Sequence, residues 1–251
     1  LLKKGSLYKV YNNNLLYHGC IPLNEDGSFK AVDIYGKKYK GKALYEVLEA
    51  YVRKAFVAID ENEREKGKDI LWFIWSSPGS PLFGKQKMAT FERYFLAEKE
   101  THEEKKNPYY RLLEDETVIN RIMREFGLEE GCAHIVNGHH AAGESPIKCN
   151  GKVLVIDGGF SKAYQKETGI AGYTLIYNSW GMILAAHEPF TSAEDAITRE
   201  TDILSDSILV KRSMIRKTVE DTDNGRKLKE NIEELKALLA AYRSGTIIEK
   251  E

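Results

Sequence analysis

The sequence predicts an α/β fold. Short runs of apolar and β-branched residues, typical of strands, lie on both sides of a central region with helical periodicity. The first runs are in SLYKVYNNNLLYHG (residues 6–19), and the later ones fall between residues 133 and 188. The 251 residues are 42% hydrophobic and 30% charged, which is typical of a globular protein with a substantial core.

Charge and cysteine content narrow the partners and the cellular compartment. Lys and Arg number 37 against 38 Asp and Glu, so no basic surface favours nucleic acid or an anionic membrane as a partner. Cys20, Cys132 and Cys149 are odd in number and far apart, which predicts a reducing compartment and a cytoplasmic protein. The apolar runs are too short to span a bilayer, and we expect no signal peptide.

The first half of the chain is expected to pass from a hairpin to helices. The run NNN at 12–14 predicts a tight turn between two strands, because asparagine tolerates left-handed backbone. DENEREKGK (60–68) predicts a solvated connection, and DILWFIW (69–75) either a buried strand or a short buried helix. Between them and the hairpin, one helical face starts at Lys42 and carries Leu44, Val47, Leu48, Tyr51, Val52, Ala55 and Phe56.

Further elements follow a loop at SSPGSPLFGK (76–85), where two prolines and two glycines break regular structure. Helices are expected at about 87–99 and at a segment that ends at Gly127. The latter turns inward Val118, Ile119, Ile122, Met123 and Phe126. The runs AHIVNG, KVLVIDGG, GYTLIY and MILAAHE predict a sheet region. An amphipathic helix is expected at about 225–243, with Leu228, Ile232, Leu235, Leu238, Leu239 and Tyr242 on its apolar face.

Two histidines stand out because each follows a predicted strand and has a glycine beside it. They are His18 in LYHGCIP and His139 in HIVNGHH. In layered α/β folds ligands bind beyond the carboxyl ends of strands, and neutral imidazole is a common metal ligand. For each histidine alone, a turn at a strand end is the favoured interpretation. The occurrence of two such histidines strengthens the interpretation as a metal site, although their spacing alone does not establish it.

Several lysines are candidates for contacts to an anionic substrate. GSPLFGKQ (79–86) approaches the phosphate loop G-x-x-x-x-G-K-[ST], but Gln86 replaces the hydroxyl residue and Pro81 lacks a backbone donor. A phosphate contact by Lys85 is therefore favoured over nucleotide hydrolysis, with a solvated lysine as the alternative. Lys148 and Lys162 flank a strand that ends at Asp157, and both are also compatible with surface lysines.

The chain resembles a known enzyme family. LYHGCIP, VNGHH and VLVIDGG are similar to motifs of calcineurin-like metallophosphoesterases. SPLFGKQKMATFERYF, THEEKKNPYYRL and IDGGFSKAYQKETGIAGYTLIYNS resemble the bacterial class III fructose-1,6-bisphosphatases, and the similarity covers essentially the whole chain.

The resemblance implies a gluconeogenic phosphatase that removes the 1-phosphate of fructose 1,6-bisphosphate. It implies Mn²⁺ in a two-metal site, with His18 and His139 binding one of the ions. It also implies the C-terminal portion of a metallophosphoesterase αββα sandwich, with a helical insertion at about 42–126 and a C-terminal helix. Substrate contacts are assigned to Lys85, Lys148 and Lys162.

Two departures from the family pattern qualify these expectations. The motifs D-x-H, G-D-x-x-D-R-G and G-N-H-[DE], which supply the other metal ligands, are absent, and the chain begins at Leu1 in strand-like sequence. We therefore expect a piece of a longer enzyme that is inactive by itself. The segment HAAGESPIK (140–148) is shorter than its family counterpart. A metallophosphoesterase for another phosphoester and a non-catalytic regulatory or assembly module are the alternatives, and a homo-oligomer remains open.

Overall fold

The computed structural model describes residues 2–129, 131–139, 145–157, 165, 169, 171–189, 192–200 and 205–248. These residues form a mixed α/β structure, as the sequence predicts. The chain divides into two compact units, residues 1–174 with 185–206, and residues 175–184 with 207–251. None of the described helices combines the length and hydropathy needed to cross a membrane.

The first unit is built on a five-stranded sheet of order β1-β2-β5-β7-β6. Its strands are β1 (Tyr8–Tyr11), β2 (Asn14–Tyr17), β5 (His134–Asn137), β6 (Ile147–Lys148) and β7 (Val153–Val155). β2, β5 and β7 run parallel, whereas β1 and β6 are antiparallel edge strands. The carboxyl ends of the three parallel strands therefore lie together at one end of the sheet, which we call the carboxyl edge. Their amino ends form the opposite, amino edge. The expected asparagine turn is confirmed, because Asn12 and Asn13 have φ of 48° and 59°.

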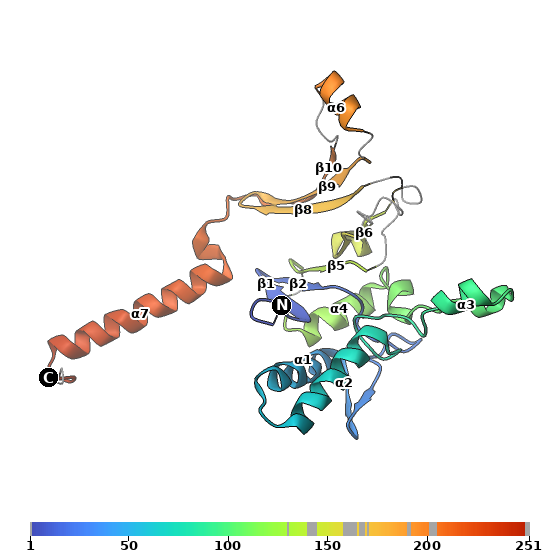
Figure 1. Cartoon of the computed structure of the whole chain (residues 1–251). Helices are drawn as coiled ribbons and strands as arrows, with labels where there is room; N and C mark the ends of the chain where they lie inside the picture. The colour runs from blue at the N-terminus through green and yellow to red at the C-terminus, as the bar shows by residue number, and fades with distance from the viewer. Residues whose placement is uncertain are drawn as a thin grey trace. The chain divides into compact units, whose positions relative to one another are not determined.

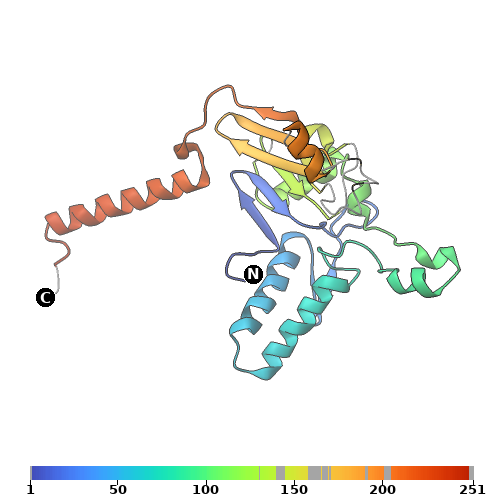
Figure 2. The same cartoon turned by 45° about the horizontal axis from the view of Figure 1, so that its top comes forward.

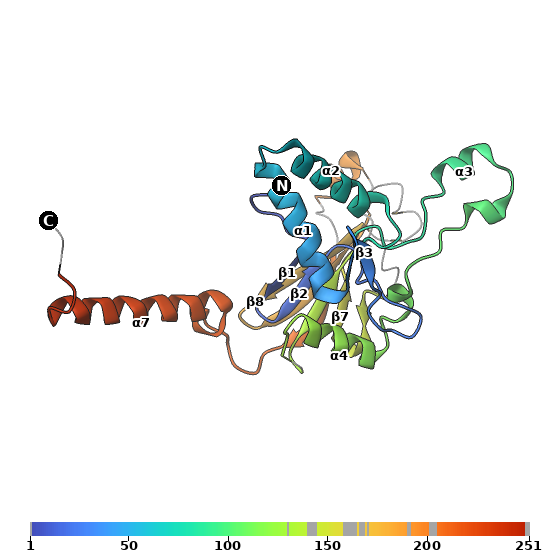
Figure 3. The same cartoon turned by 90° about the horizontal axis from the view of Figure 1, so that it is seen from below.

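One face of this sheet carries the main hydrophobic core. In β2, Leu15 and Tyr17 are buried, whereas Leu16 and His18 on the opposite face are exposed. The buried face packs against α1 (Gly41–Val57) and α4 (Glu116–Glu125), which both lie over the sheet in Figure 3. α4 turns inward the residues that the sequence predicts, and Gly127 (φ 74°) follows its end.

A long connection joins the neighbouring parallel strands β2 and β5. It contains the hairpin β3 (Val32–Ile34) and β4 (Lys37–Tyr39), then α1, α2 (Glu61–Ser76), α3 (Thr90–Phe95), the 3-10 turns η1 (Lys99–His102) and η2 (Pro108–Arg111), and α4. Figures 1 and 2 both show α1 and α2 side by side. α1 buries Leu44, Leu48 and Val52 as predicted, but Phe56 points away from the helix pair and is 73% exposed.

α2 corrects two expectations. Residues 61–68, predicted to be a solvated connection, form its first half, because the Asp60 carboxylate accepts hydrogen bonds from the Asn62 and Glu63 amides. Gly67 does not break the helix; a Cβ atom there would lie 2.0 Å from the Ala55 Cβ, so glycine permits the close approach of α1. Residues 69–75 are helical and only half-buried: Ile70 and Ile74 face inward, whereas Trp72 and Trp75 are exposed.

The prediction of a helix at about 87–99 is wrong about its length. Only Thr90–Phe95 forms an α-helix, and η1 follows it. Residues 86–105, which we call the arm, extend from the sheet in Figure 1. No residue of α3 is buried, so no core contact extends the helix.

The remaining strands form a three-stranded sheet of order β10-β9-β8. β8 covers Gly172–Asn178, β9 Gly181–His187 and β10 Ser205–Arg212. The sequence-predicted strand pair around NSWG is therefore present. α6 (Ala193–Arg199) and η4 (Val219–Asp221) are short. α7 covers Asp223–Arg243, where the sequence predicts a helix, and its apolar residues from Leu228 to Tyr242 stay 44–63% exposed.

Candidate functional site

The carboxyl edge of the five-stranded sheet brings together three segments that are distant in sequence. His18 follows β2, Gly138 and His139 follow β5, and Asp157 lies two residues beyond β7. The Gly138 amide donates to the His18 carbonyl (3.0 Å), and the Ile156 amide donates to the Asn137 carbonyl (2.9 Å). Pairing between the strands therefore continues into the turns and fixes their spacing.

The two predicted histidines lie side by side. His18 Nε2 is 3.0 Å from His139 Nδ1, and the ring centroids are 4.9 Å apart with the planes at 75°. His18 is exposed and His139 is half-buried. The two histidines therefore form one pair at the carboxyl edge, although 121 positions separate them in sequence.

Backbone strain at His139 brings the rings together. Regular alternation along β5 would turn His139 to the core face, away from His18. Instead His139 has φ of 72°, in the left-handed region that residues other than glycine rarely adopt. Such conformations concentrate at functional sites, where the surrounding structure maintains them.

The carbonyl of Phe83 selects the tautomer of His139. His139 Nε2 lies 3.2 Å from the Phe83 oxygen, which can only accept, so Nε2 carries the proton. The lone pair of Nδ1 is then directed at His18. Burial, and next the neighbouring His18 ring, lower the pKa of His139, so the neutral imidazole is favoured.

Gly19 is required by the turn after His18. A Cβ atom at this position would lie 2.2 Å from the Pro81 oxygen, and the Cys20 amide donates to that same oxygen (2.8 Å). The glycine thus lets the proline-containing loop pack directly on the turn. This contact also places the Phe83 carbonyl beside His139.

Buried tyrosines pack on the core side of the turn that follows His18. Tyr45 Oη donates to the Cys20 carbonyl (2.8 Å), and the hydroxyls of Tyr17 and Tyr109 are 2.6 Å apart. Burial raises the pKa of the Cys20 thiol to about 12 and that of Tyr17 well above its ordinary value. These groups therefore stay protonated at neutral pH and act as uncharged packing beneath the histidines.

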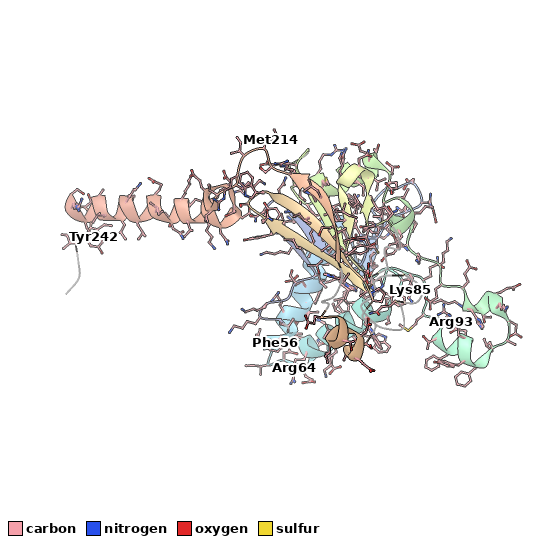
Figure 4. All side chains as sticks on the ribbon, turned by 90° about the horizontal axis from the view of Figure 1, so that it is seen from above. Phe56, Arg64, Lys85, Arg93, Met214 and Tyr242 are labelled. Carbon is pink, nitrogen blue, oxygen red and sulfur yellow. The ribbon has the colours of Figure 1, made fainter. Side chains whose placement is uncertain are left out.

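Lys85 lies at the base of the arm and is already paired. Its Nζ is 2.6 Å from Glu104 Oε2 and 5.5 Å from the centre of the Phe83 ring. Figure 4 labels Lys85 near the sheet and Arg93 farther out on the arm. Burial alone raises the pKa of Glu104, but hydrogen bonds from Lys85 and the Ala89 amide outweigh it and hold the pKa below the ordinary carboxyl value.

Lys148, another predicted lysine, is not brought to the histidine pair. Lys148 lies in β6 opposite Val153, the first residue of β7, so it occupies the amino edge of the parallel strands. There its Nζ is 3.4 Å from Glu114. Lys162 and most of the shortened segment after His139 lie outside the described residues.

A cavity of about 750 Å³ opens beside the histidines. Its lining is mostly apolar, with Leu16, Leu82 and Val136 among the contributors, and it includes Asp157 and the basic residues Lys4 and Lys9. Sequence reasoning missed Lys4 and Lys9, which stand in no motif, and the Phe83 carbonyl, since a backbone group has no sequence signal.

The histidine pair fits part of a divalent metal site. Two nitrogens about 2.1 Å from one ion are about 3.0 Å apart when they occupy adjacent positions of an octahedral ion, which matches the Nε2–Nδ1 distance. In metal-binding histidines the ring nitrogen that does not bind the ion commonly donates to a backbone carbonyl, as His139 Nε2 does to Phe83. The described part of the chain contains no cluster of three or more His, Cys, Asp or Glu side chains that would complete a site.

The fold and the paired histidines define an α/β protein with its candidate site at the carboxyl ends of parallel strands. The sequence matches the family described as Firmicute fructose-1,6-bisphosphatase over residues 1–244, and the chain belongs to this family. The resemblance found in the sequence motifs is thereby confirmed.

Individual relatives agree with the family match. The chain is 57% identical over 254 aligned residues to a fructose-1,6-bisphosphatase class 3 of Clostridioides difficile (strain 630), covering 99% of the chain and 38% of that protein. A class 3 protein of Listeria monocytogenes serotype 4b (strain CLIP80459) is 54% identical, with 99% and 39% covered. The chain thus spans about two fifths of these relatives' length. No solved structure matches it.

Proposed function

We propose that the protein hydrolyses fructose 1,6-bisphosphate to fructose 6-phosphate and phosphate, as a gluconeogenic enzyme. The family membership and the printed names of the relatives support this substrate. The observation that carries the site assignment is the 3.0 Å approach of His18 Nε2 to His139 Nδ1, with the Phe83 carbonyl fixing the tautomer.

We further propose that His18 and His139 hold one Mn²⁺ of a two-metal site. Bound divalent ions would supply a Lewis acid and a more acidic water at neutral pH. The chain's own residues prepare this site: Phe83 orients His139, and Gly19 allows the loop that carries Phe83 to approach. Asp157, which lines the same cavity, offers a carboxylate of the kind that suits manganese.

The substrate contacts are proposed from the sequence motif, since Lys85 does not belong to the lining of the cavity beside the histidines. Lys85 is proposed to bind a phosphate, in competition with the carboxylate of Glu104. Lys148 and Lys162 remain predictions from the sequence. A metallophosphoesterase sandwich with residues 42–126 as a helical insertion, a homo-oligomer and a cytoplasmic location belong to the same proposal, and no nucleic-acid or membrane partner is invoked.

The test is phosphate release by the full-length protein with and without Mn²⁺. Fructose 1,6-bisphosphate should be turned over faster than other sugar phosphates, and His139→Ala should remove most of the activity. Equal rates on unrelated phosphoesters would favour the broader metallophosphoesterase alternative. Full activity of His139→Ala, or no Mn²⁺-dependent turnover at all, would overturn the proposal and favour a non-catalytic module.

A further inference from the structure

Asn137, the last residue of β5, connects the two turns that carry the histidines. It is separated from His139 by Gly138 alone, and its side chain reaches the other turn: Nδ2 donates to the carbonyl of Gly19 (3.3 Å). Gly19 in turn follows His18. The Asn137 amide therefore joins the residue after one histidine to the strand that precedes the other.

This contact completes a set of restraints on the turn after β2. The His18 carbonyl accepts from the Gly138 amide, and the next carbonyl, of Gly19, accepts from Asn137. The following residue, Cys20, is held by Pro81. The Gly19 carbonyl and the Cys20 amide belong to the same peptide unit. Without the Asn137 side chain this unit would keep its bond to Pro81 but lose the one that ties it to β5.

The asparagine is a poor choice for stability alone. Asn137 is 2% exposed, and its Oδ1 has no hydrogen-bond partner among the described residues. A buried acceptor without a partner is unfavourable, and asparagine is disfavoured in strands. The neighbours on this face, Ile135, Val153 and Val155, are apolar. An apolar residue at 137 would suit the core better, so packing alone does not account for the amide.

We propose that Asn137 is a positioning residue that sets the spacing of His18 and His139 and thereby the affinity for a divalent metal. This inference rests on the proposed function, because it assumes that the two histidines bind one ion. Asn137 itself does not touch the ion; it acts through the Gly19 carbonyl.

The experiment measures Mn²⁺ affinity and the metal-free unfolding midpoint of the full-length protein and its Asn137→Leu variant. Leucine has a similar volume and removes both the donor and the unpartnered acceptor. We expect a midpoint equal to or above that of wild type, with Mn²⁺ affinity lowered about tenfold. This is the lower end of the range for groups that hydrogen-bond a metal ligand directly, because Asn137 acts one residue further away through Gly19. A purely structural hydrogen bond predicts the reverse: a lower midpoint with unchanged affinity.

The control is Ile135→Val, which lies on the same strand and face and leaves the amide intact. It should lower the midpoint and leave Mn²⁺ affinity within about twofold of wild type, because it only removes buried volume. If Asn137→Leu does not fold, Asn137→Ser tests the loss of Mn²⁺ affinity alone, because the smaller side chain leaves a cavity that lowers the midpoint by itself. An Asn137 variant that binds Mn²⁺ like wild type, or loses no more affinity than Ile135→Val, overturns the inference.

His139→Asn separates this inference from the proposed function. Asparagine tolerates the left-handed backbone but removes the imidazole. If His139→Asn binds Mn²⁺ like wild type, the metal assignment fails and the inference fails with it. If His139→Asn loses affinity while Asn137→Leu does not, only the role of Asn137 is overturned.

Discussion

The amino and carboxyl edges of the five-stranded sheet differ in the contacts that their polar side chains make. At the amino edge, charged groups have close partners: Lys148 pairs with Glu114, Lys152 with Glu116, and the Cys149 amide donates to Glu114 (2.6 Å). At the carboxyl edge, His139 has a strained backbone, Asn137 has a buried oxygen without a partner among the described residues, and two histidines face each other.

Left-handed backbone and a buried oxygen without a described partner are not confined to the carboxyl edge. At the amino edge, Cys149 and Asn150 have φ of 49° and 52°, and Asn14 Oδ1 has no partner among the described residues. What distinguishes the carboxyl edge is that such groups lie beside two paired histidines and a cavity. Ion pairs and capping bonds at the amino edge close the structure with groups of the chain itself. Groups held in unfavourable arrangements tend to mark functional sites, because a ligand completes interactions that the chain leaves open. Substitutions at the carboxyl edge should therefore affect binding, and those at the amino edge only stability.

The largest effect is expected for the histidine pair. His18→Ala and His139→Ala should each weaken Mn²⁺ binding by more than about 100-fold, beyond the range for outer-shell residues. The double variant should resemble either single one, because an incomplete metal shell has little left to lose. Titration of the full-length proteins with Mn²⁺ measures this. Additive losses would mean that the histidines act separately, and similar metal-free midpoints exclude misfolding.

Two glycines allow a direct comparison of the edges. Gly19→Ala should lower the free energy of unfolding by about 1–3 kcal/mol, the cost of overpacking, because its Cβ would meet the Pro81 oxygen. It should also weaken Mn²⁺ binding by shifting His18. Gly151, in the turn before β7, has φ of 88° and open space around a Cβ. Gly151→Ala should cost about 1–2 kcal/mol from backbone strain alone.

Urea unfolding and Mn²⁺ titration of both glycine variants check this pair of predictions. Loss of Mn²⁺ affinity in Gly151→Ala would show that the two edges are coupled. Unchanged affinity in a folded Gly19→Ala would remove the loop contact from the description of the site.

Lys85 is expected to have a moderate effect on substrate binding. Lys85→Ala should raise KM about tenfold with a smaller change in kcat, since a charged hydrogen bond contributes about 1.5–3 kcal/mol. Lys87→Ala is the matched control, because Lys87 is exposed and donates to the Thr101 carbonyl on the arm. Steady-state kinetics with fructose 1,6-bisphosphate measure KM and kcat for both variants. Equal KM values would mean that Lys85 pairs with Glu104 and does not bind the substrate.

The Glu104 carboxylate should produce a pH-dependent contribution to stability. Because its folded-state pKa lies below the unfolded value, its stabilisation is fully present above the ordinary pKa of about 4.3 and is lost as the pH falls through the folded pKa. The difference in unfolding free energy between wild type and Glu104→Gln should therefore shrink in acid. Urea titrations between pH 3 and 6 measure it, and a difference that grows in acid would contradict the pairing.

The smallest effect is expected at the amino edge. Lys148→Ala should lower the unfolding free energy by less than about 1 kcal/mol, because its partner Glu114 is largely exposed. Mn²⁺ affinity and KM should not change if Lys148 serves only the fold. A raised KM would instead return Lys148 to the substrate-binding residues that the sequence suggests.

Local patterns were reliable where a single physical cause dominates. The asparagine turn, the inward face of α4 and the glycine after it all follow from backbone preference or apolar spacing within a few residues. The pattern failed for α2, where a run of charged residues resembles a linker. Capping by Asp60 and the close contact between Gly67 and Ala55 stabilise a helix there, and the second of these depends on α1.

The sequence by itself determined the α/β class, the family and the two histidines that follow strands, because these depend on residue type, order and spacing. Only the tertiary structure decided that the histidines meet, since parallel pairing of β2, β5 and β7 brings together turns that lie far apart in sequence. It also decided that Lys148 lies at the opposite edge from them, that the Phe83 carbonyl lies beside His139, and that Asn137 donates to the Gly19 carbonyl. Those contacts depend on a backbone carbonyl and on burial, which no local pattern encodes.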